Sequence, residues 1–103
     1  LRSDLPDSWY NLAWLRRQAR QFDLALRDYQ RALELGVAMP EEVHLNRAVI
    51  LSDHLHRPKE ARAELDRALA LNPRFVPALL NLGNWHEDHG ERDQLADLDP
   101  DIE

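Results

Sequence analysis

The chain has 103 residues, of which 44% are apolar and 31% charged, and its formal net charge is −6. It contains no cysteine, which excludes disulfide bridges, cysteine-ligated metal centres and thiol catalysis. An acidic chain repels phosphate backbones, so neither nucleic acid nor an anionic membrane is an expected partner. The length fits one domain, and a composition rich in Leu, Ala and charged residues with only three glycines favours an all-α fold.

Three features of the composition bear on location and origin. No apolar run approaches the roughly 18 residues that a membrane-spanning helix needs. The first residues, Leu1 to Asp4, do not begin a secretory signal, and the lack of an initiator Met indicates a trimmed or excised segment. We therefore expect a cytoplasmic protein. Lys59 is the one lysine among 13 basic residues, an arginine bias that we interpret as typical of a GC-rich bacterial genome.

Apolar residues recur with helical spacing along most of the chain, as at Phe22, Ala25, Leu26 and Tyr29. Prolines stand where first helical turns are expected, since a missing N–H costs nothing there. The pair Asn72-Pro73 ends one helix, because the residue before proline avoids the α region. The pattern predicts helices at 7–19, 22–35, 41–55, 58–71 and 76–89, then a short sixth at 91–98 and a frayed tail at 99–103.

The sequence repeats itself. Residues 25–35 (ALRDYQRALEL) align with 61–71 (ARAELDRALAL) at a period of 36 residues. Upstream, residues 9–13 align with 45–49 at the same offset and with 79–83 after 34 further residues. Two full units and the first half of a third are therefore expected, each unit being a pair of helices.

The repeated residues carry a known pattern, W-x2-L-G followed by A-x3-F and a proline. It stands here as Trp9-x2-Leu12-Ala13…Ala25-x3-Tyr29, as Leu45-x2-Ala48-Val49…Ala61-x3-Leu65…Pro73, and as Leu79-x2-Leu82-Gly83. The chain thus resembles the tetratricopeptide repeat (TPR) family. The resemblance implies one domain over 1–103, a right-handed α-solenoid of antiparallel helix pairs, with repeats at about 6–39 and 42–75 and a partial repeat at 76–98. It departs from the pattern where Arg16, Ser52 and His86 replace the usual aromatic residue.

A stack of such pairs has a concave groove lined by the first helix of each pair, and function in this fold lies in the groove. Tyr10 and Trp14 form an expected anchor for an apolar residue of a peptide, unless the N-terminal segment or a neighbouring domain covers them. Asp53, Glu87 and Asp88 favour basic partner residues. The predicted groove residues are Tyr10, Asn11, Trp14, Arg17, Asn46, Arg47, Ile50, Asp53, Leu80, Asn81, Asn84 and Glu87.

No catalytic chemistry is expected. The chain has three serines, no threonine and no glycine-rich phosphate loop. The histidine pairs His54-x-His56 and His86-x2-His89 lack a third ligand at fixed spacing, so we predict neither a metal site nor a cofactor. The sequence predicts a protein–protein interaction module that holds a peptide or helix of a partner in the groove. The alternative is an accessory segment of a larger bacterial enzyme, such as a sulfotransferase or glycosyltransferase, which a catalytic domain encoded after residue 103 would favour.

Self-association is a further expectation. The fifth predicted helix carries Leu79, Leu80, Leu82 and Trp85, and the acidic segment after it is too short to cover them fully. Residues 1–36 carry a net charge of +1 and residues 74–103 a net charge of −6. We therefore expect a weak homo-oligomer through the C-terminal end of the stack, with unlike ends in contact.

Overall fold

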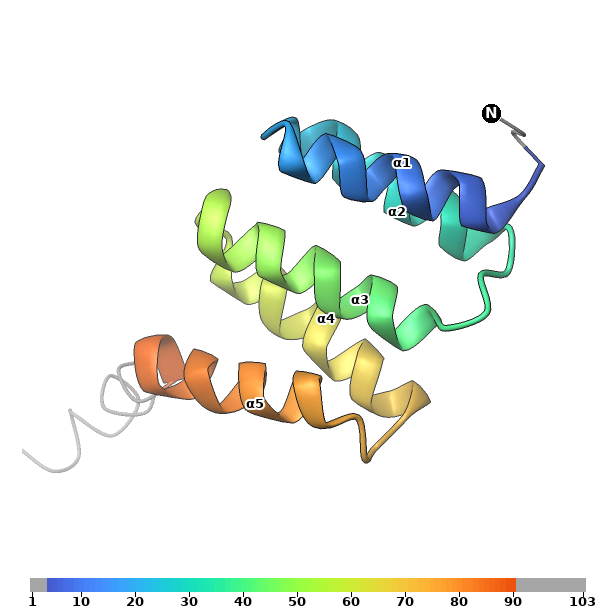
Figure 1. Cartoon of the computed structure of the whole chain (residues 1–103). Helices are drawn as coiled ribbons and strands as arrows, with labels where there is room; N and C mark the ends of the chain where they lie inside the picture. Colours follow the sequence, from blue (N-terminus) through green and yellow to red (C-terminus); the bar gives the residue numbers. More distant parts are fainter. Residues whose placement is uncertain (1–3, 91–103) are drawn as a thin grey trace, which may run out of the picture.

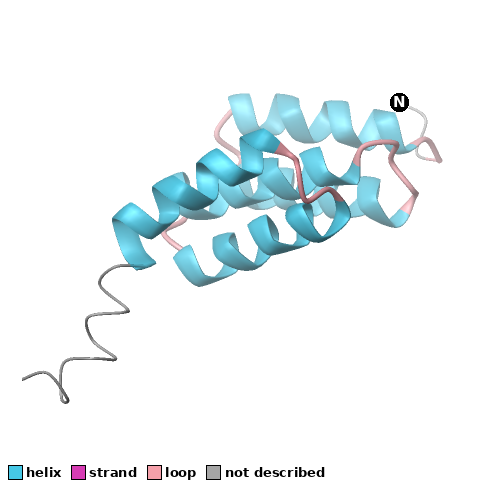
Figure 2. Cartoon of the chain, turned by 90° about the horizontal axis from the view of Figure 1, so that it is seen from below, coloured by secondary structure: helices cyan, strands magenta, loops and turns pink. Residues whose placement is uncertain are grey.

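The structure is a computed structural model that describes residues 4–90, and within this range it is all-α without a strand (Figures 1 and 2). The helices are α1 (Pro6–Gln18), α2 (Phe22–Glu34), α3 (Pro40–Val49), α4 (Pro58–Leu71) and α5 (Val76–Trp85). A π-helical turn extends α3 (η1, Ile50–His54), and another extends α5 (η2, His86–Gly90). The all-α prediction is confirmed. The predicted sixth helix at 91–98 and the tail at 99–103 lie outside the described residues.

The predicted helix starts agree with the structure to within one residue. Pro6, Pro40 and Pro58 each occupy the first turn of a helix, as expected. The prediction of one regular helix over 41–55 is wrong in its last turn. There the N–H of Leu55 donates to the carbonyl of Ile50 five residues back, at 3.1 Å, which widens the turn.

The helix ends have an identifiable backbone geometry. Gly36 follows α2 with φ of 82°, and the N–H groups of Gly36 and Val37 donate to the carbonyls of Leu33 and Ala32, both at 3.1 Å. This is a Schellman motif, which requires a left-handed residue and explains the glycine. Arg20 takes the same position after α1 with φ of 62°, although it has a side chain that disfavours this conformation.

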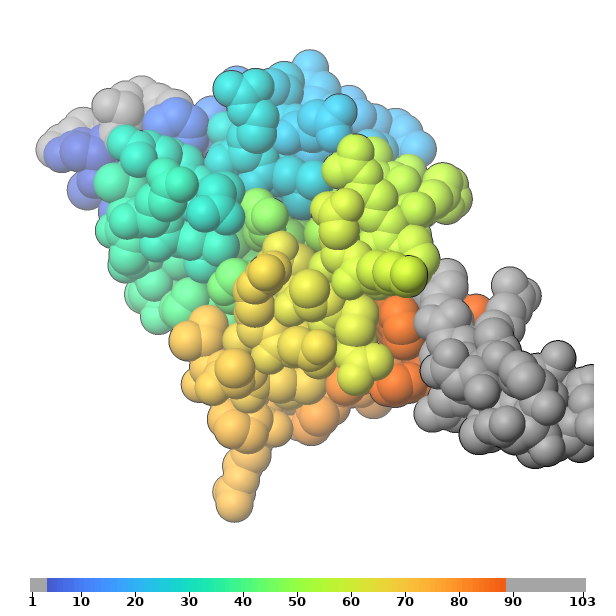
Figure 3. Space-filling view, turned by 180° about the vertical axis from the view of Figure 1, so that it is seen from behind, coloured from blue at the N-terminus to red at the C-terminus, as the bar shows by residue number. Residues whose placement is uncertain are grey.

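The helices form two layers. In Figure 1, α1, α3 and α5 lie in front, with α2 and α4 behind them, and the opposite view in Figure 3 brings α2 and α4 forward. One core cluster contains buried residues of α1, α2, α3 and η1, and another joins α3 and η1 to α4 and α5. Leu26 and Leu55 pack against both clusters, so the core is continuous along the stack. The outer surface of the front layer is called the α1–α3–α5 face below.

Small residues mark the close helix contacts, as the repeat pattern predicts. Ala25, Ala32, Ala61 and Ala68 have no exposed area. A larger side chain at these positions has no room unless the helices move apart.

Overpacking should therefore be costly at the α3–α4 contact. We expect Ala61→Leu or Ala68→Leu to lower the free energy of unfolding by about 1–3 kcal/mol in a urea titration. Ala70→Leu, on the exposed side of α4, is the matched control and should change it by less than about 0.5 kcal/mol. Unchanged stability in both buried variants would show that these contacts are not tight.

Two buried acids occupy equivalent places in the two units. Asp28 and Glu64 are 36 residues apart in sequence, and each is 4% exposed. Asp28 lies 3.0 Å from the guanidinium of Arg16, so an ion pair occupies the place where the repeat pattern has an aromatic residue. Burial raises the pKa of the Asp28 carboxyl, and the nearby charges of Arg16 and Arg27 offset part of that increase.

Glu64 has two arginines and a histidine as neighbours. His44 Nδ1 lies 2.7 Å from its Oε1, while Arg47 Nε and Arg67 lie 3.1 and 3.2 Å from its Oε2. Arg47 also donates to the backbone carbonyl of Leu26 on α2 at 2.8 Å. This network therefore joins α2, α3 and α4, which ties the first helix pair to the second.

Candidate functional site

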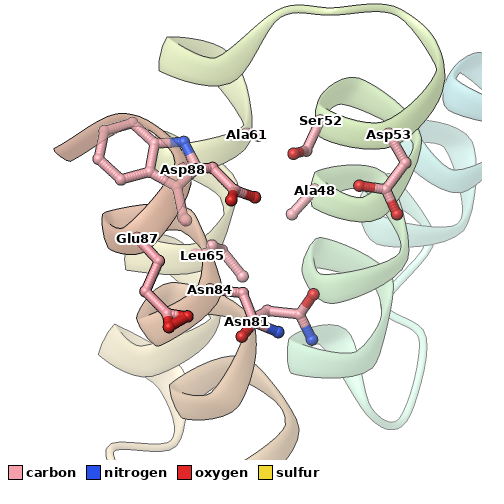
Figure 4. Close-up of a pocket in the computed structure, with 10 residues that line it drawn as sticks. Ala48, Ser52, Asp53, Ala61, Leu65, Asn81, Asn84, Glu87 and Asp88 are labelled. Carbon is pink, nitrogen blue, oxygen red and sulfur yellow. The ribbon is translucent and has the colours of Figure 1, made fainter. Parts of the chain in front are cut away.

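A pocket of about 260 Å³ lies between the C-terminal ends of the third and fifth helices. Figure 4 shows Ser52 and Asp53 on one wall and Asn84 and Asp88 on the opposite wall, with side chains of α4 behind them. Since α4 closes the back, the pocket opens on the α1–α3–α5 face. We call it the acidic pocket, and its lining residues are Ala48, Ser52, Asp53, Ala61, Leu65, Asn81, Asn84, Trp85, Glu87 and Asp88.

The charged residues that line the acidic pocket all have the same sign. Three of its ten lining residues, Asp53, Glu87 and Asp88, are acids, and none of the ten is basic. Ala61, Leu65 and Trp85 lie behind these carboxylates but are at most 8% exposed, so the accessible lining is mostly polar. Polar and acidic walls suit the charged head of a lysine or arginine side chain.

The sequence explains why this pocket is open. Ala48 lines it at the position where the other two units have Leu12 and Leu82. A methyl group in place of an isobutyl group leaves space between α3 and α5. Trp85 closes the far side, since its indole N–H donates to the carbonyl of Pro58 at 2.8 Å and fixes the ring against α4.

A second pocket, of about 180 Å³, lies between the N-terminal ends of α1 and α3. It is lined by Tyr10 and Asp7 of α1, Glu42 of α3, and the connecting residues Val37, Ala38 and Met39. Its lining is mostly apolar, with two acids among it. We call it the Tyr10 pocket, and it has the character of a site for an apolar side chain.

Asn46 joins α1 to α3. Its Oδ1 accepts a hydrogen bond from Arg17 at 2.8 Å, and its Nδ2 donates to the Glu42 carbonyl at 2.9 Å and faces the Tyr10 hydroxyl at 3.4 Å. Asn81 similarly donates to the carbonyl of Pro77 at 2.8 Å. Both asparagines thus use an amide N–H on their own helix, and Asn46 holds α1 against α3.

The structure divides the predicted groove residues into groups. Asp53, Asn81, Asn84 and Glu87 meet in the acidic pocket, and Tyr10 lies in the second pocket. Arg17 and Asn46 form the bridge between α1 and α3. Asn11, Trp14 and Leu80 are exposed, with 48% of Trp14 and 65% of Leu80 accessible to solvent.

Two predicted groove residues do not lie on this face. Ile50 has no exposed area and packs in the core with Tyr29 and Val43. Arg47 points toward Glu64 and the Leu26 carbonyl instead. The shared groove position predicted for Ile50 and Arg47 is therefore wrong: one fills the apolar core and the other neutralises a buried carboxylate.

Some lining residues did not emerge from the sequence. Ser52, Trp85 and Val37–Met39 line the two pockets, although none of them is among the predicted groove residues. The signal for the Tyr10 pocket is the uneven repeat offset, 36 residues and then 34, which indicates two additional residues in the connection between the first two units. The signal for the buried acids was their identical place in the repeat, Asp28 in ALRDY and Glu64 in ARAEL.

Two histidines of the predicted pairs pack against aromatic rings. His54 stacks on Phe22 with ring centroids 4.2 Å apart, and His86 meets Trp85 edge to face. Within residues 4–90 no group of three His, Cys, Asp or Glu side chains is placed to hold a metal ion. In the same range no helix has both the length and the apolarity that crossing a membrane requires.

Comparison with known proteins identifies the first helix pair. No curated protein matches the chain. The family model that matches part of the chain describes a helical repeat and not an enzyme. Residues 6–35, which form α1 and α2, match the tetratricopeptide repeat family, so this pair is one such repeat, and α3 to α5 continue the same arrangement of sequential helix pairs.

Proposed function

We propose that this chain is a protein–protein interaction module that binds an extended or helical segment of a partner on the α1–α3–α5 face, without catalysis of its own. The acidic pocket is the observation that carries the proposal, because it is a concave site whose charged lining residues all have the same sign. The tetratricopeptide repeat at residues 6–35 supports it, since that family is typical of protein–protein interaction.

The two pockets define the chemistry of the partner. A lysine or arginine enters the acidic pocket at the C-terminal end of α3, and an apolar residue enters the Tyr10 pocket at the N-terminal end of the same helix. Trp14 of α1 is 48% exposed, and its ring is available for stacking or cation–π contact with the partner. The partner segment is therefore basic at one end and apolar at the other.

Selection from a displayed library of random peptides tests this proposal. Enriched peptides should carry Lys or Arg together with a large apolar residue. Selection of acidic peptides, or of peptides without an apolar residue, would contradict the proposed polarity.

Trp14 provides the sharpest single-residue test of the face. We expect Trp14→Ala to raise the dissociation constant of a selected peptide about tenfold in a fluorescence anisotropy titration, because an exposed aromatic anchor is lost. Leu71→Ala is the matched control, since Leu71 is 55% exposed but lies on α4, away from the face. Equal affinities for Trp14→Ala and the unmodified chain would place the binding surface elsewhere.

A further inference from the structure

The two pockets lie at opposite ends of α3 and on opposite sides of it. The Tyr10 pocket lies between α1 and α3 beside Glu42, and the acidic pocket lies between α3 and α5 beside Asp53 of η1. Glu42 and Asp53 are 11 residues apart, which at the helical rise places them roughly 16 Å apart along the axis. Since α3 stands between α1 and α5 in the front layer (Figure 1), a partner segment that fills both pockets must cross the outer surface of α3.

Two side chains of α3, Asn46 and Val49, lie on this path, and we call them the crossing surface. Helical spacing puts both on the same side of α3 as Glu42 and Asp53. Val49 is half-buried and belongs to neither core cluster, so its side chain is on the outer side of the helix. Between the two pockets, α3 thus presents one apolar side chain and one amide to a partner.

The amide of Asn46 is already occupied. Its Nδ2 donates to the Glu42 carbonyl at 2.9 Å and to the Tyr10 hydroxyl at 3.4 Å, and its Oδ1 accepts from Arg17 at 2.8 Å. An extended peptide exposes one N–H and one C=O per residue, and each needs a partner where water is excluded. The crossing surface has no free donor for such a backbone, and residues 4–90 contain no strand edge with which it could pair.

A helical partner avoids this cost, because its N–H and C=O groups bond to each other within the helix. Helical residues 11 positions apart are separated by three turns, about 16 Å, and point to the same side. This separation matches that between Glu42 and Asp53, and an apolar residue between the two would rest on Val49. An extended segment covers about 16 Å in only five residues.

We propose that the partner segment is an amphipathic helix that crosses α3. A lysine or arginine of that helix enters the acidic pocket, a large apolar residue about 11 positions away enters the Tyr10 pocket, and an apolar residue between them packs on Val49. The negative charge of Asp53 and Asp88 fixes which end of the helix is basic. The inference rests on the proposed function and narrows it, because it excludes an extended segment and sets the spacing of the two anchors.

Three synthetic peptides of equal length and composition test the spacing. Each carries one Leu and one Arg in the same background rich in Ala and Gln, which favours a helix, with these anchors 11, 9 or 5 positions apart. Anchors 9 positions apart lie on opposite sides of a helix, and anchors 5 apart reach both pockets only in an extended chain. In an NMR titration of the ¹⁵N-labelled chain, the peptide with anchors 11 apart should have a dissociation constant at least about tenfold below the other two.

Proline distinguishes the two conformations without changing the anchors. A proline midway between the anchors of the 11-position peptide should raise its dissociation constant at least about tenfold, because it breaks the helix. The matched control places the proline at the first helical position of the peptide, where it is tolerated. This control should change the dissociation constant by less than about twofold.

Val49→Asn tests the crossing surface on the chain itself. It should raise the dissociation constant of the 11-position peptide about fivefold, because a polar group then lies under the apolar side of the partner helix. Leu71→Asn is the matched control, since Leu71 is exposed on α4, and it should leave the affinity unchanged. Circular dichroism verifies that both variants keep their helix content.

An extended partner would give different results. Tightest binding by the peptide with anchors 5 positions apart, or equal affinities with and without the central proline, would overturn this inference and leave the proposed function standing. Unchanged affinity in Val49→Asn would exclude a crossing over α3. If none of the three peptides shifts the amide signals of Asp53 and Asp88, the proposed function fails and the inference fails with it.

Discussion

Glu64→Ala is expected to lower the free energy of unfolding by about 3 kcal/mol, because it leaves a partly buried arginine without its counter-charge. The side chains of Arg47 and His44 are only 18% and 14% exposed, so water cannot fully replace the lost carboxylate. The change also removes an interaction that joins three helices. A urea titration followed by circular dichroism measures the effect.

An exposed ion pair on the same helix provides the control. Asp66 is 57% exposed and accepts a hydrogen bond from Arg62 one turn earlier at 3.2 Å. Asp66→Ala should cost no more than about 0.5 kcal/mol, since water screens this pair. If Glu64→Ala and Asp66→Ala cost the same, the buried network contributes nothing to stability beyond a surface pair.

The Glu64 network should also respond to acid. Burial alone would raise the pKa of Glu64, but hydrogen bonds and charge from His44 and Arg47 outweigh it and hold the pKa below the ordinary value of 4.5. A lowered folded-state pKa gives stability that is complete above the unfolded-state value and lost as the pH falls through the folded-state value. The cost of Glu64→Gln should therefore be smaller at pH 3 than at pH 7. A cost independent of pH would contradict this origin.

Reversing the charge of the acidic pocket should have the largest effect on binding. Asp53→Lys with Asp88→Lys is expected to raise the dissociation constant of a basic, apolar peptide at least about 100-fold. Each substitution replaces an attraction by a repulsion, and tenfold corresponds to about 1.4 kcal/mol. Both residues are exposed and outside the core, so the fold should persist. Fluorescence anisotropy with a labelled peptide measures the change.

The matched control moves the same charge change to another surface. Glu60→Lys with Asp66→Lys alters two exposed acids of α4, which do not line the acidic pocket. It should change the dissociation constant of the peptide by less than about threefold, because salt screens charges that lie far from the bound peptide. Equal losses in the two double variants would mean that net charge, and not the pocket, determines binding.

Most of the fold was predictable because independent features of the sequence indicate the same helices. Prolines at first turns and helical spacing of apolar residues gave all five described helices, and the 36-residue period gave their pairing. The π-helical turn at Ile50 was not predictable. It depends on which backbone carbonyl accepts from Leu55, and no side-chain pattern encodes that choice.

The candidate site was less predictable than the fold. Periodicity assigns residues to a face of a helix, and two of the residues that it assigned to the groove, Asp53 and Asn84, line the acidic pocket. It could not foresee that Arg47 would turn toward Glu64, because that depends on a buried charge of another helix. Periodicity also could not show that the small side chain of Ala48 leaves a cavity. Whether space stays empty depends on the size and position of all the surrounding side chains.

Mapping a bound peptide by NMR tests the central claim most directly. A selected basic, apolar peptide titrated into the ¹⁵N-labelled chain should shift the amide signals of Asp53, Asn84 and Asp88, together with those around Tyr10. Signals on the outer side of α4, such as that of Asp66, should not move. Shifts confined to α2 and α4, or absent from the acidic pocket, would contradict the assignment of the α1–α3–α5 face as the binding surface.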